Sequence, residues 1–280
     1  MGDRVAVATV PRLIFLHVPR TSGSTLHGIL SRQYRPEETH TEEIFLPPDV
    51  QRFRDMPEDQ RARIRLLKGH LSFGLHEFMP GPSTYLTMVR DPIDRLVSYY
   101  YYVKRRPAAV LHGYVKGVDL ATFVSEGRAR DHTDNSFVRF FSGSPFVEQG
   151  TIDERLLDRA KANLAKHFVL IGQQRYFDES ILMLKQELGW TPPYYRNKNV
   201  TKGRPKVAEI DDRTRRILEE HTVFDREIFD YCTKLFREKL ESMPEGFHRD
   251  LRSFRRRNRA LQGAYRVLQP LRERLPSARH

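Results

Sequence analysis

The chain has 280 residues, of which 39% are hydrophobic and 30% charged, a composition that suits one sizeable α/β domain and excludes an intrinsically disordered chain. Its formal net charge of +12 favours anionic partners, including nucleotides, acidic glycans, nucleic acids and acidic membranes, without discriminating among them. The single cysteine, Cys232, excludes an intrachain disulfide and a cysteine-based metal cluster, and we expect it to be a small core residue.

The first predicted element is a buried strand over residues 13–18, an apolar run that contains one histidine, His17. Pro19 ends this strand, a loop rich in hydroxyl groups follows, and helical apolar spacing begins at Leu26. Backbone N–H groups at such a helix start, together with the positive charge of Arg20, make an anion site. The loop has neither the ATPase pattern G-x-x-x-x-G-K-[ST] nor the dinucleotide-binding pattern G-x-G-x-x-G. The alternative to an anion site is a polar turn that binds no ligand.

Residues 36–59 are rich in proline and charge and predict irregular structure, after which residues 64–67 form a second apolar run. His70 follows that run, and the pKa of a histidine side chain suits proton transfer near neutral pH. We therefore take His70 as the candidate general base and His76 as a second candidate. A hydrogen-bonded structural role remains the alternative for His70, and it is the expected role of His17.

A second buried strand is predicted over residues 84–89, and the sequence R-D-P-I-D-R-L-V-S follows it at residues 90–98. Asp91 suits an N-cap and Pro92 the first position of a helix that runs to Lys104. Arg90 would then sit at the carboxyl end of a strand, where ligands bind in open α/β sheets, with Ser98 two turns into the helix. The alternative is that Arg90 pairs with a carboxylate such as that of Asp94.

Downstream, residues 119–166 read as helical, residues 167–172 as a strand, and residues 196–205 as a basic loop. Further helices are predicted at about 177–188, 209–220 and 223–241. This alternation of strands and helices predicts a parallel sheet with helices on both faces.

Together these motifs resemble those of sulfotransferases that use 3′-phosphoadenosine 5′-phosphosulfate (PAPS), in the carbohydrate-modifying branch that includes the heparan sulfate 2-O-sulfotransferases. The first loop there reads P-K-T-G/S-G-S/T-T, so Arg20 stands where lysine is usual, whereas R-D-P-x-x-R-x-x-S matches at every position. The likeness covers roughly residues 12–240. It implies a three-layer α/β/α fold with a central parallel sheet, akin to P-loop nucleotide kinases, and a sulfotransferase domain over residues 1–248.

The resemblance also implies roles for individual residues, in direct in-line transfer of a sulfuryl group to an acceptor hydroxyl. His70 would remove the hydroxyl proton, and Arg20, whose guanidinium cannot readily give up a proton, would act as an electrostatic clamp. No metal is required. The residues expected to bind PAPS are Arg20, Thr21, Ser22, Gly23, Ser24, Thr25, Arg90, Ser98, Lys202 and Arg204.

The segment D-N-x-x-x-R-x-x-S-G at residues 134–143 resembles a family segment near the acceptor pocket, which implies substrate binding by Asn135 and Arg139. A capped helix start with a solvated arginine is the alternative. The expected acceptor is a sugar hydroxyl on a glycan, a glycolipid or a glycosylated small molecule, with no nucleic acid partner. Two other classes remain open: a P-loop-like phosphoryl transferase that depends on ATP and Mg²⁺, and a basic protein that binds polyanions.

The tail, residues 249–280, is basic and predicts an amphipathic helix. We expect it to pack on the domain with its arginines solvated, and peripheral contact with an anionic membrane is the alternative. No apolar run reaches the roughly 18 residues that a membrane helix needs, and residues 1–11 are too short and too weakly apolar for a signal peptide. The expectation from these features is a cytoplasmic enzyme.

Overall fold

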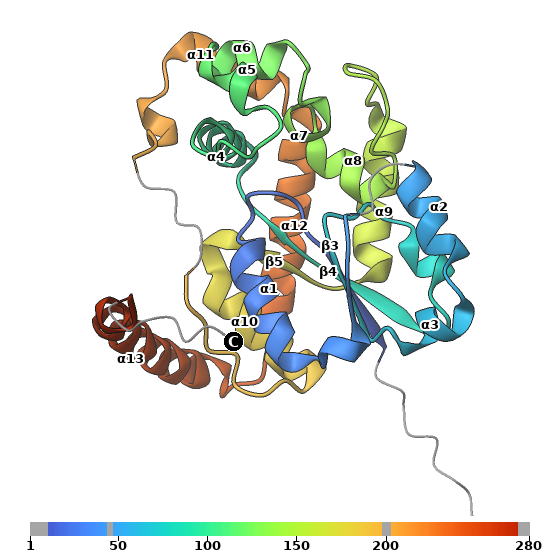
Figure 1. Ribbon diagram of the computed structural model, residues 1–280, viewed down its shortest axis with the longest axis vertical. Coiled ribbons are helices and arrows are strands. Elements are labelled where there is room, and N and C mark those ends of the chain that lie inside the picture. The colour runs from blue at the N-terminus through green and yellow to red at the C-terminus, as the bar shows by residue number, and fades with distance from the viewer. Residues whose placement is uncertain (1–10, 44–46, 198–202, 274–280) are drawn as a thin grey trace, which may run out of the picture.

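The centre of the molecule is a parallel sheet of five strands in the order β2-β3-β1-β4-β5 (Figure 1). This is a computed structural model, and it describes residues 11–43, 47–197 and 203–273. The pairings of β1 with β3 and β4, of β2 with β3, and of β4 with β5 are all parallel. The strands are β1 (Arg12–Leu16), β2 (Thr39–Thr41), β3 (Leu66–Gly69), β4 (Ser83–Val89) and β5 (Phe168–Gln173).

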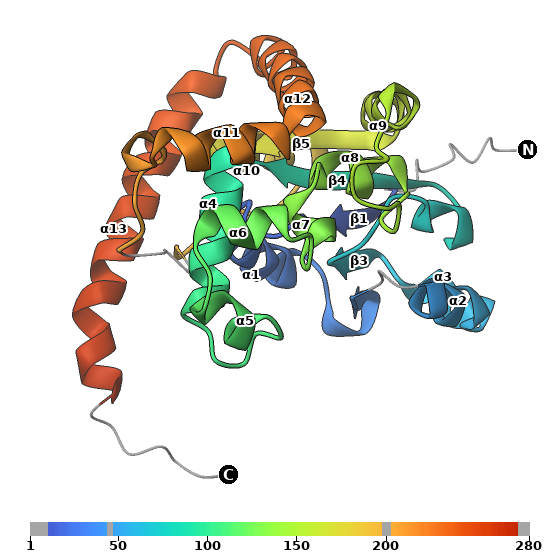
Figure 2. The ribbon, with the colours of Figure 1, turned by 90° about the horizontal axis from the view of Figure 1, so that it is seen from above.

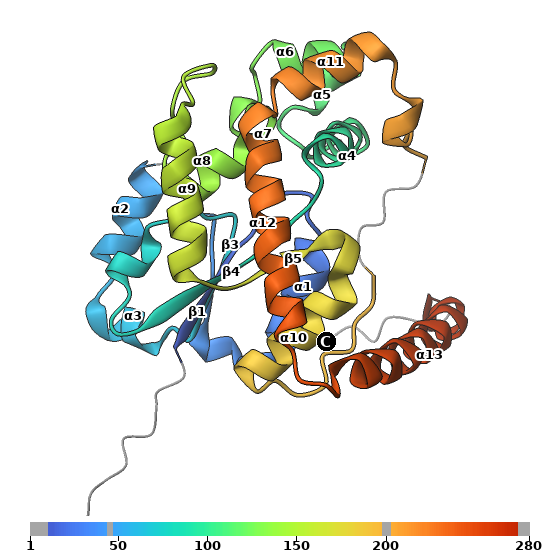
Figure 3. The same ribbon diagram turned by 180° about the vertical axis from the view of Figure 1, so that it is seen from behind.

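Helices cover both faces of this sheet, which confirms the predicted three-layer α/β/α fold. Helices α1 and α10 lie in front of the sheet in Figure 1, and α9 and α12 lie in front of it in the reverse view of Figure 3. The helices are α1 (Gly23–Gln33), α2 (Pro47–Asp55), α3 (Glu58–Arg63), α4 (Pro92–Lys104), α5 (His112–Lys116), α6 (Leu120–Ser125), α7 (Arg130–Thr133), α8 (Ser136–Ser142), α9 (Glu154–His167), α10 (Phe177–Leu188), α11 (Asp212–Glu220), α12 (Val223–Glu241) and α13 (Phe247–Glu273).

Strand β1 shows why the sheet needs two covering layers. Leu13 and Phe15 pack into a core shared with α1, α10 and α13, whereas Ile14 and Leu16 pack into a core shared with α8, α9 and α12. Side chains alternate across a strand, so an unbroken apolar run supplies both faces of a buried sheet. None of the helices that the structure describes is long and apolar enough to cross a membrane.

The sequence-based expectation of irregular structure over residues 36–59 is wrong, because this segment holds the edge strand β2 and the helix α2. Strand β2 is only Thr39-His40-Thr41, which carries no apolar alternation for a pattern to detect. Gly69 allows the chain after β2 to run close to β3, since a Cβ atom there would lie 1.7 Å from the carbonyl oxygen of Glu42.

Helix α13 begins at Phe247 and packs its first half on the domain, as expected for a packed amphipathic tail. Phe247, Leu251 and Phe254 are buried in the same core as α1 and α10. The exposed arginines of this half are Arg249, Arg252, Arg256, Arg257 and Arg259. Figure 2 shows the rest of the helix extending away from the sheet. Cys232 is fully buried in the other core, as predicted.

Candidate active site

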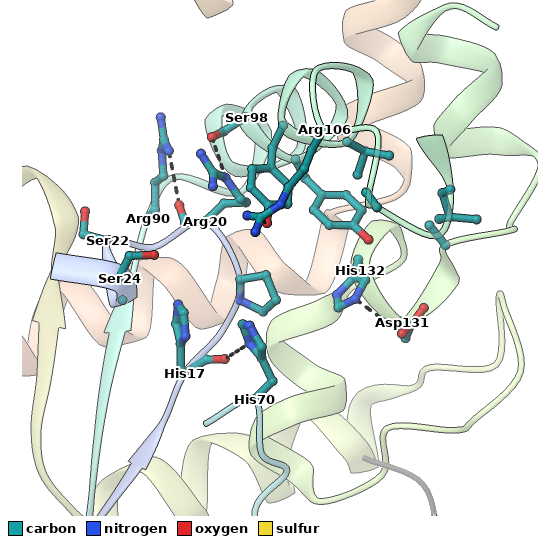
Figure 4. Close-up of a pocket in the computed structure, with 18 of the residues that line it drawn as sticks. His17, Arg20, Ser22, Ser24, His70, Arg90, Ser98, Arg106, Asp131 and His132 are labelled. Atoms are coloured by element: carbon teal, nitrogen blue, oxygen red, sulfur yellow. Dashed lines mark hydrogen bonds and ion pairs between the residues drawn. The ribbon is translucent and has the colours of Figure 1, made fainter. Parts of the chain in front are cut away.

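A cavity of about 970 Å³ opens at the carboxyl ends of the strands (Figure 4). The residue after β1, His17, lines it, as do His70 after β3, Arg90 after β4 and Gln174 after β5. Parallel strands end at one edge of a sheet, and the loops that follow them converge there. The cavity therefore brings together three segments that the sequence analysis had singled out separately.

The loop between β1 and α1 forms one wall of the cavity. Arg20 and Ser22 adopt left-handed backbone angles, with φ values of 71° and 76°, which turn the chain sharply into the start of α1. Gly23 begins the helix, and a Cβ atom there would lie 1.9 Å from His17 Nε2, so no larger residue fits. Five of the loop residues expected to bind the donor line the cavity: Arg20, Ser22, Gly23, Ser24 and Thr25.

Thr21 differs from the other residues of this loop. Its side chain is fully buried, and its hydroxyl donates a hydrogen bond to the carbonyl oxygen of Val18 at 2.7 Å. Thr21 does not line the cavity, so the structure gives its hydroxyl a role in closing the turn.

The loop meets the second motif directly. Arg20 Nε donates to Ser98 Oγ at 3.1 Å, and Arg90 Nη1 donates to the carbonyl oxygen of Arg20 at 3.2 Å. Figure 4 shows Arg20, Arg90 and Ser98 above His70 in the view, and all four residues line the cavity. Arg20 thus joins two residues that lie 70 and 78 positions later in the chain, in one polar cluster at the ends of β1 and β4.

A carboxylate completes this cluster. Asp94 pairs with Arg90 and also with Arg204, each at 2.6 Å, so the predicted alternative partner of Arg90 is present while Arg90 still lines the cavity. Arg204 lines the cavity too, whereas Lys202 lies outside the described residues. We call the following set the donor cluster: Arg20, Arg90, Asp94, Ser98 and Arg204.

Positive charge is in excess in the donor cluster, which holds three arginines and one carboxylate. Burial and the neighbouring charge of Arg90 lower the pKa of Arg20 to about 10, and burial also lowers the pKa of Arg90. Both side chains remain charged at neutral pH. An anion bound among them would relieve their mutual repulsion, which makes the cluster a suitable seat for phosphate groups.

His70 lies deeper in the same cavity. Its Nδ1 is 2.9 Å from the carbonyl oxygen of His17, which is an acceptor only, so the proton sits on Nδ1 and the lone pair on Nε2. Its ring stacks on that of His17 with centroids 4.4 Å apart. Burial lowers the pKa of His70, so the imidazole is neutral at physiological pH, the form that a general base requires.

The other two histidines considered from the sequence differ in position. His17 lines the cavity and is 3.2 Å from His27 through its Nδ1, and burial lowers its pKa well below the usual value. His76 does not line the cavity and instead contacts the hydroxyl of Tyr85. Geometry therefore favours His70 over His76 as the base.

The two residues expected to bind the acceptor, Asn135 and Arg139, do not line the cavity. Asn135 Oδ1 accepts hydrogen bonds from the backbone N–H groups of Phe224 and Asp225 at 3.0 and 3.2 Å. Arg139 is 1% exposed and donates to the carboxylate of Asp134, so it is not the solvated arginine of the alternative either. We call this buried set the α8 network: Asp134, Asn135, Arg139 and Asp225.

Several cavity residues were not proposed from the sequence. The end of α4 supplies Tyr99 and Tyr102, and the turn before α7 supplies Arg128. His132 of α7 faces His70 across the cavity in Figure 4, with its Nε2 3.6 Å from Asp131 Oδ2. Burial lowers the pKa of His132 to about 4. The tyrosine run 99–102 was a visible signal, whereas nothing in residues 128–132 marks them before the chain is folded.

Comparison with known proteins places this arrangement in a family. The sequence model of the family described as Galactose-3-O-sulfotransferase matches residues 5–267. The chain belongs to this family. Relatives include mouse galactose-3-O-sulfotransferase 3, which is 25% identical over 79% of this chain and 55% of the relative, and human galactose-3-O-sulfotransferase 2, 25% identical over 68% and 50%. A heparin sulfate O-sulfotransferase of Drosophila melanogaster is 24% identical over 63% and 55%.

Family membership confirms the resemblance that the motifs carried, to carbohydrate sulfotransferases. The chain spans about half the length of the curated relatives it matches. The residues matched by the family model, 5–267, include the β1–α1 loop, the donor cluster and His70.

Proposed function

We propose that the protein is a PAPS-dependent sulfotransferase that transfers a sulfuryl group to a sugar hydroxyl. The observation that carries this proposal is one cavity in which the β1–α1 loop, the donor cluster and His70 meet, in a chain of the galactose-3-O-sulfotransferase family. The names of the relatives refer to galactose and to heparan or heparin sulfate, which supports a carbohydrate acceptor.

The residues around the cavity fit the donor. PAPS carries negative charge on its 5′-phosphosulfate and on its 3′-phosphate, and the cavity wall offers Arg20, Arg90 and Arg204 together with the N-terminus of α1. We assign the 5′ end to the loop over residues 20–25, in which Thr21 closes the turn, and the 3′-phosphate to Arg90 and Ser98. Arg204, in the basic loop over residues 196–205, lines the cavity beside them, and Lys202 of the same loop lies outside the described residues.

When bound, PAPS supplies an activated sulfuryl group whose leaving group is adenosine 3′,5′-bisphosphate. His70 Nε2 takes the proton of the acceptor hydroxyl as the acceptor oxygen bonds to sulfur and the bond from sulfur to the phosphate oxygen breaks. Arg20 and the N–H groups at the start of α1 stabilise the charge that develops on the departing phosphate oxygen. The lowered pKa of His70 keeps its lone pair available for this step near neutral pH.

The test is donor binding followed by transfer. Calorimetry with adenosine 3′,5′-bisphosphate, ATP with Mg²⁺ and adenosine 5′-monophosphate should give clearly tightest binding for the bisphosphate, because it alone presents phosphates at both the 3′ and 5′ positions. Incubation with radiolabelled PAPS and a panel of β-galactosides and heparan fragments should then label a saccharide. Preference for ATP, or labelling of no saccharide, would refute the proposal in favour of a phosphoryl transferase or a polyanion-binding protein.

A further inference from the structure

Tyr102 on α4 contacts the guanidinium of Arg20 and is not part of the proposed donor site. The guanidinium carbon of Arg20 lies 4.5 Å from the centroid of the Tyr102 ring, and Tyr102 lines the cavity. One helical turn earlier, Ser98 accepts a hydrogen bond from Arg20 Nε. Positions four apart share one face of a helix, so α4 contacts the arginine at two adjacent points, one polar and one aromatic.

Arg20 needs such support. Its backbone adopts the left-handed region, with φ at 71°, and its side chain is surrounded by Arg90, Arg105 and Arg204, whose charges repel it. A long side chain with several rotatable bonds loses entropy when it is held in one position, and repulsion favours other positions. The face of an aromatic ring attracts a cation and offers a flat surface that matches the plane of a guanidinium.

Tyr102 is itself held in place by a second arginine. Arg106, one turn further along the chain, lies with its guanidinium carbon 5.3 Å from the same ring centroid and donates a hydrogen bond to the phenol oxygen. The oxygen of Tyr102 thus accepts a hydrogen bond from Arg106, while the ring contacts both Arg20 and Arg106. Replacing Tyr102 by phenylalanine removes the oxygen and keeps the ring, so substitutions are able to separate the two contributions.

We propose that Tyr102 is a positioning residue, an aromatic platform that holds the guanidinium of Arg20 where the donor's 5′-phosphate binds. This inference rests on the proposed function and adds a residue to it. The platform acts through its ring and through Arg20, and we therefore expect two results. Phenylalanine at position 102 should support donor binding as well as tyrosine does, and Tyr102 should have no effect on donor binding once Arg20 is replaced.

The first experiment compares four proteins by calorimetry with adenosine 3′,5′-bisphosphate. Tyr102→Phe should bind within about twofold of the wild type, and Tyr102→Leu about tenfold more weakly, the size of one partly buried cation–π contact. Tyr101→Leu is the matched control, because it makes the same change at the next position of α4 on a tyrosine that does not line the cavity. Thermal melting of each variant checks that it is folded, and Tyr102→Gln carries the same measurement if Tyr102→Leu does not fold.

The second experiment is a double-mutant cycle with Arg20→Ala. If Tyr102 acts through Arg20, adding Tyr102→Leu to Arg20→Ala should weaken nucleotide binding no further. A full tenfold additional loss would show that Tyr102 acts independently and would overturn the inference. Equal binding by the wild type and Tyr102→Leu would also overturn it while leaving the proposed function intact. Absence of binding to the wild type itself would refute both.

Discussion

The donor cluster and the α8 network are both built from arginines and their polar partners, but their guanidinium groups face different surroundings. Arg139 donates to the Asp134 carboxylate and backbone carbonyl and to the carbonyls of Val147 and Glu148, and it is 1% exposed. Arg90 shares one carboxylate with another arginine and lines a cavity. The first guanidinium is fully engaged in joining helices, and the second is oriented toward a space that a ligand can occupy.

This difference teaches how to separate binding arginines from structural ones. A buried charge is tolerated only when its donors are satisfied, so an arginine saturated by carbonyl oxygens has little capacity left for a ligand. In the α8 network, the polar groups bind other parts of the protein. The carboxylate of Asp225, for example, ties the start of α12 to the start of α8, because it accepts hydrogen bonds from the N–H groups of Phe137 and Val138. Where arginines outnumber the carboxylates around them, in contrast, the excess positive charge favours the binding of an anion.

The sharpest test on the cavity side is His70→Ala. Loss of the general base should reduce kcat by about 10²- to 10⁴-fold, while binding of adenosine 3′,5′-bisphosphate stays near the wild-type value. His76→Ala is the matched control, because His76 does not line the cavity and should retain most activity. If His76→Ala caused the larger loss of kcat, the assignment of the base would be wrong.

On the network side, Arg139→Ala should destabilise the fold by about 3–5 kcal/mol, because it leaves the Asp134 carboxylate buried without its partner. Urea unfolding measures this loss, with Arg155→Ala as the control, since the side chain of Arg155 is 92% exposed in a surface pair with Asp153. Donor affinity, measured at a temperature where the variant is folded, should not change. A folded, stable variant with a raised acceptor KM would instead restore the acceptor-binding role predicted from the motif.

The same contrast explains which parts of the fold and of the site can be predicted from the sequence alone. Strands β1 and β4 and helix α4 were predicted because continuous apolar runs and the Asp91-Pro92 cap are local signals, and the cap is present, with Asp91 accepting from Asp94 N–H. Residues 119–166 read as helical, and they form α6, α7, α8 and α9, but the helix boundaries were not predicted, and some lie at left-handed residues such as Asn135 and Gly143.

Those breaks decide which side chains reach the cavity, and they depend on tertiary contacts. Asn135 adopts its left-handed conformation while its side chain caps backbone N–H groups 89 and 90 residues later in the chain. No local pattern encodes a partner at that separation. Asn135 and Arg139 lie one helical turn apart, but such spacing does not tell whether residues on one face of a helix meet a ligand or a core.

A smaller effect is expected for Arg204→Ala. It removes one of three cations from the donor cluster and leaves Asp94 to pair with Arg90 alone, so the nucleotide should bind about tenfold more weakly. Arg213→Ala is the control, because it removes the same charge from an exposed position near the start of α11. Titration at low and high salt should show the difference between the two variants persisting, since a partly buried contact is screened less than a surface charge. Equal losses in both variants would reduce the role of Arg204 to general surface charge.

The pH dependence should be smaller still near neutrality. Burial lowers the pKa of His70, and the neutral imidazole is the active form, so kcat/KM should stay level on acidification to about pH 6.5 and decline only below it.

The stability of the fold should also decrease on acidification. The pKa values of His17 and His132 are also lowered in the folded state, so below about pH 6.5 the unfolded chain binds more protons and the melting temperature falls toward pH 4. His132→Gln should reduce the fall in melting temperature between pH 6.5 and pH 4. For the activity, a decline in kcat/KM centred above pH 7 would contradict a buried neutral base.

The smallest effect is expected on α13, whose exposed arginines resemble neither cluster because they face solvent. The triple variant Arg252→Gln, Arg256→Gln, Arg259→Gln should change stability by less than about 0.5 kcal/mol and leave nucleotide affinity unaltered, since the apolar side chains of this helix are already packed on the domain. Wild type and variant should also sediment equally little with vesicles that contain anionic lipid. Vesicle binding by the wild type that the variant loses would show that this face meets a membrane, because each basic side chain near such a surface contributes about 1 kcal/mol.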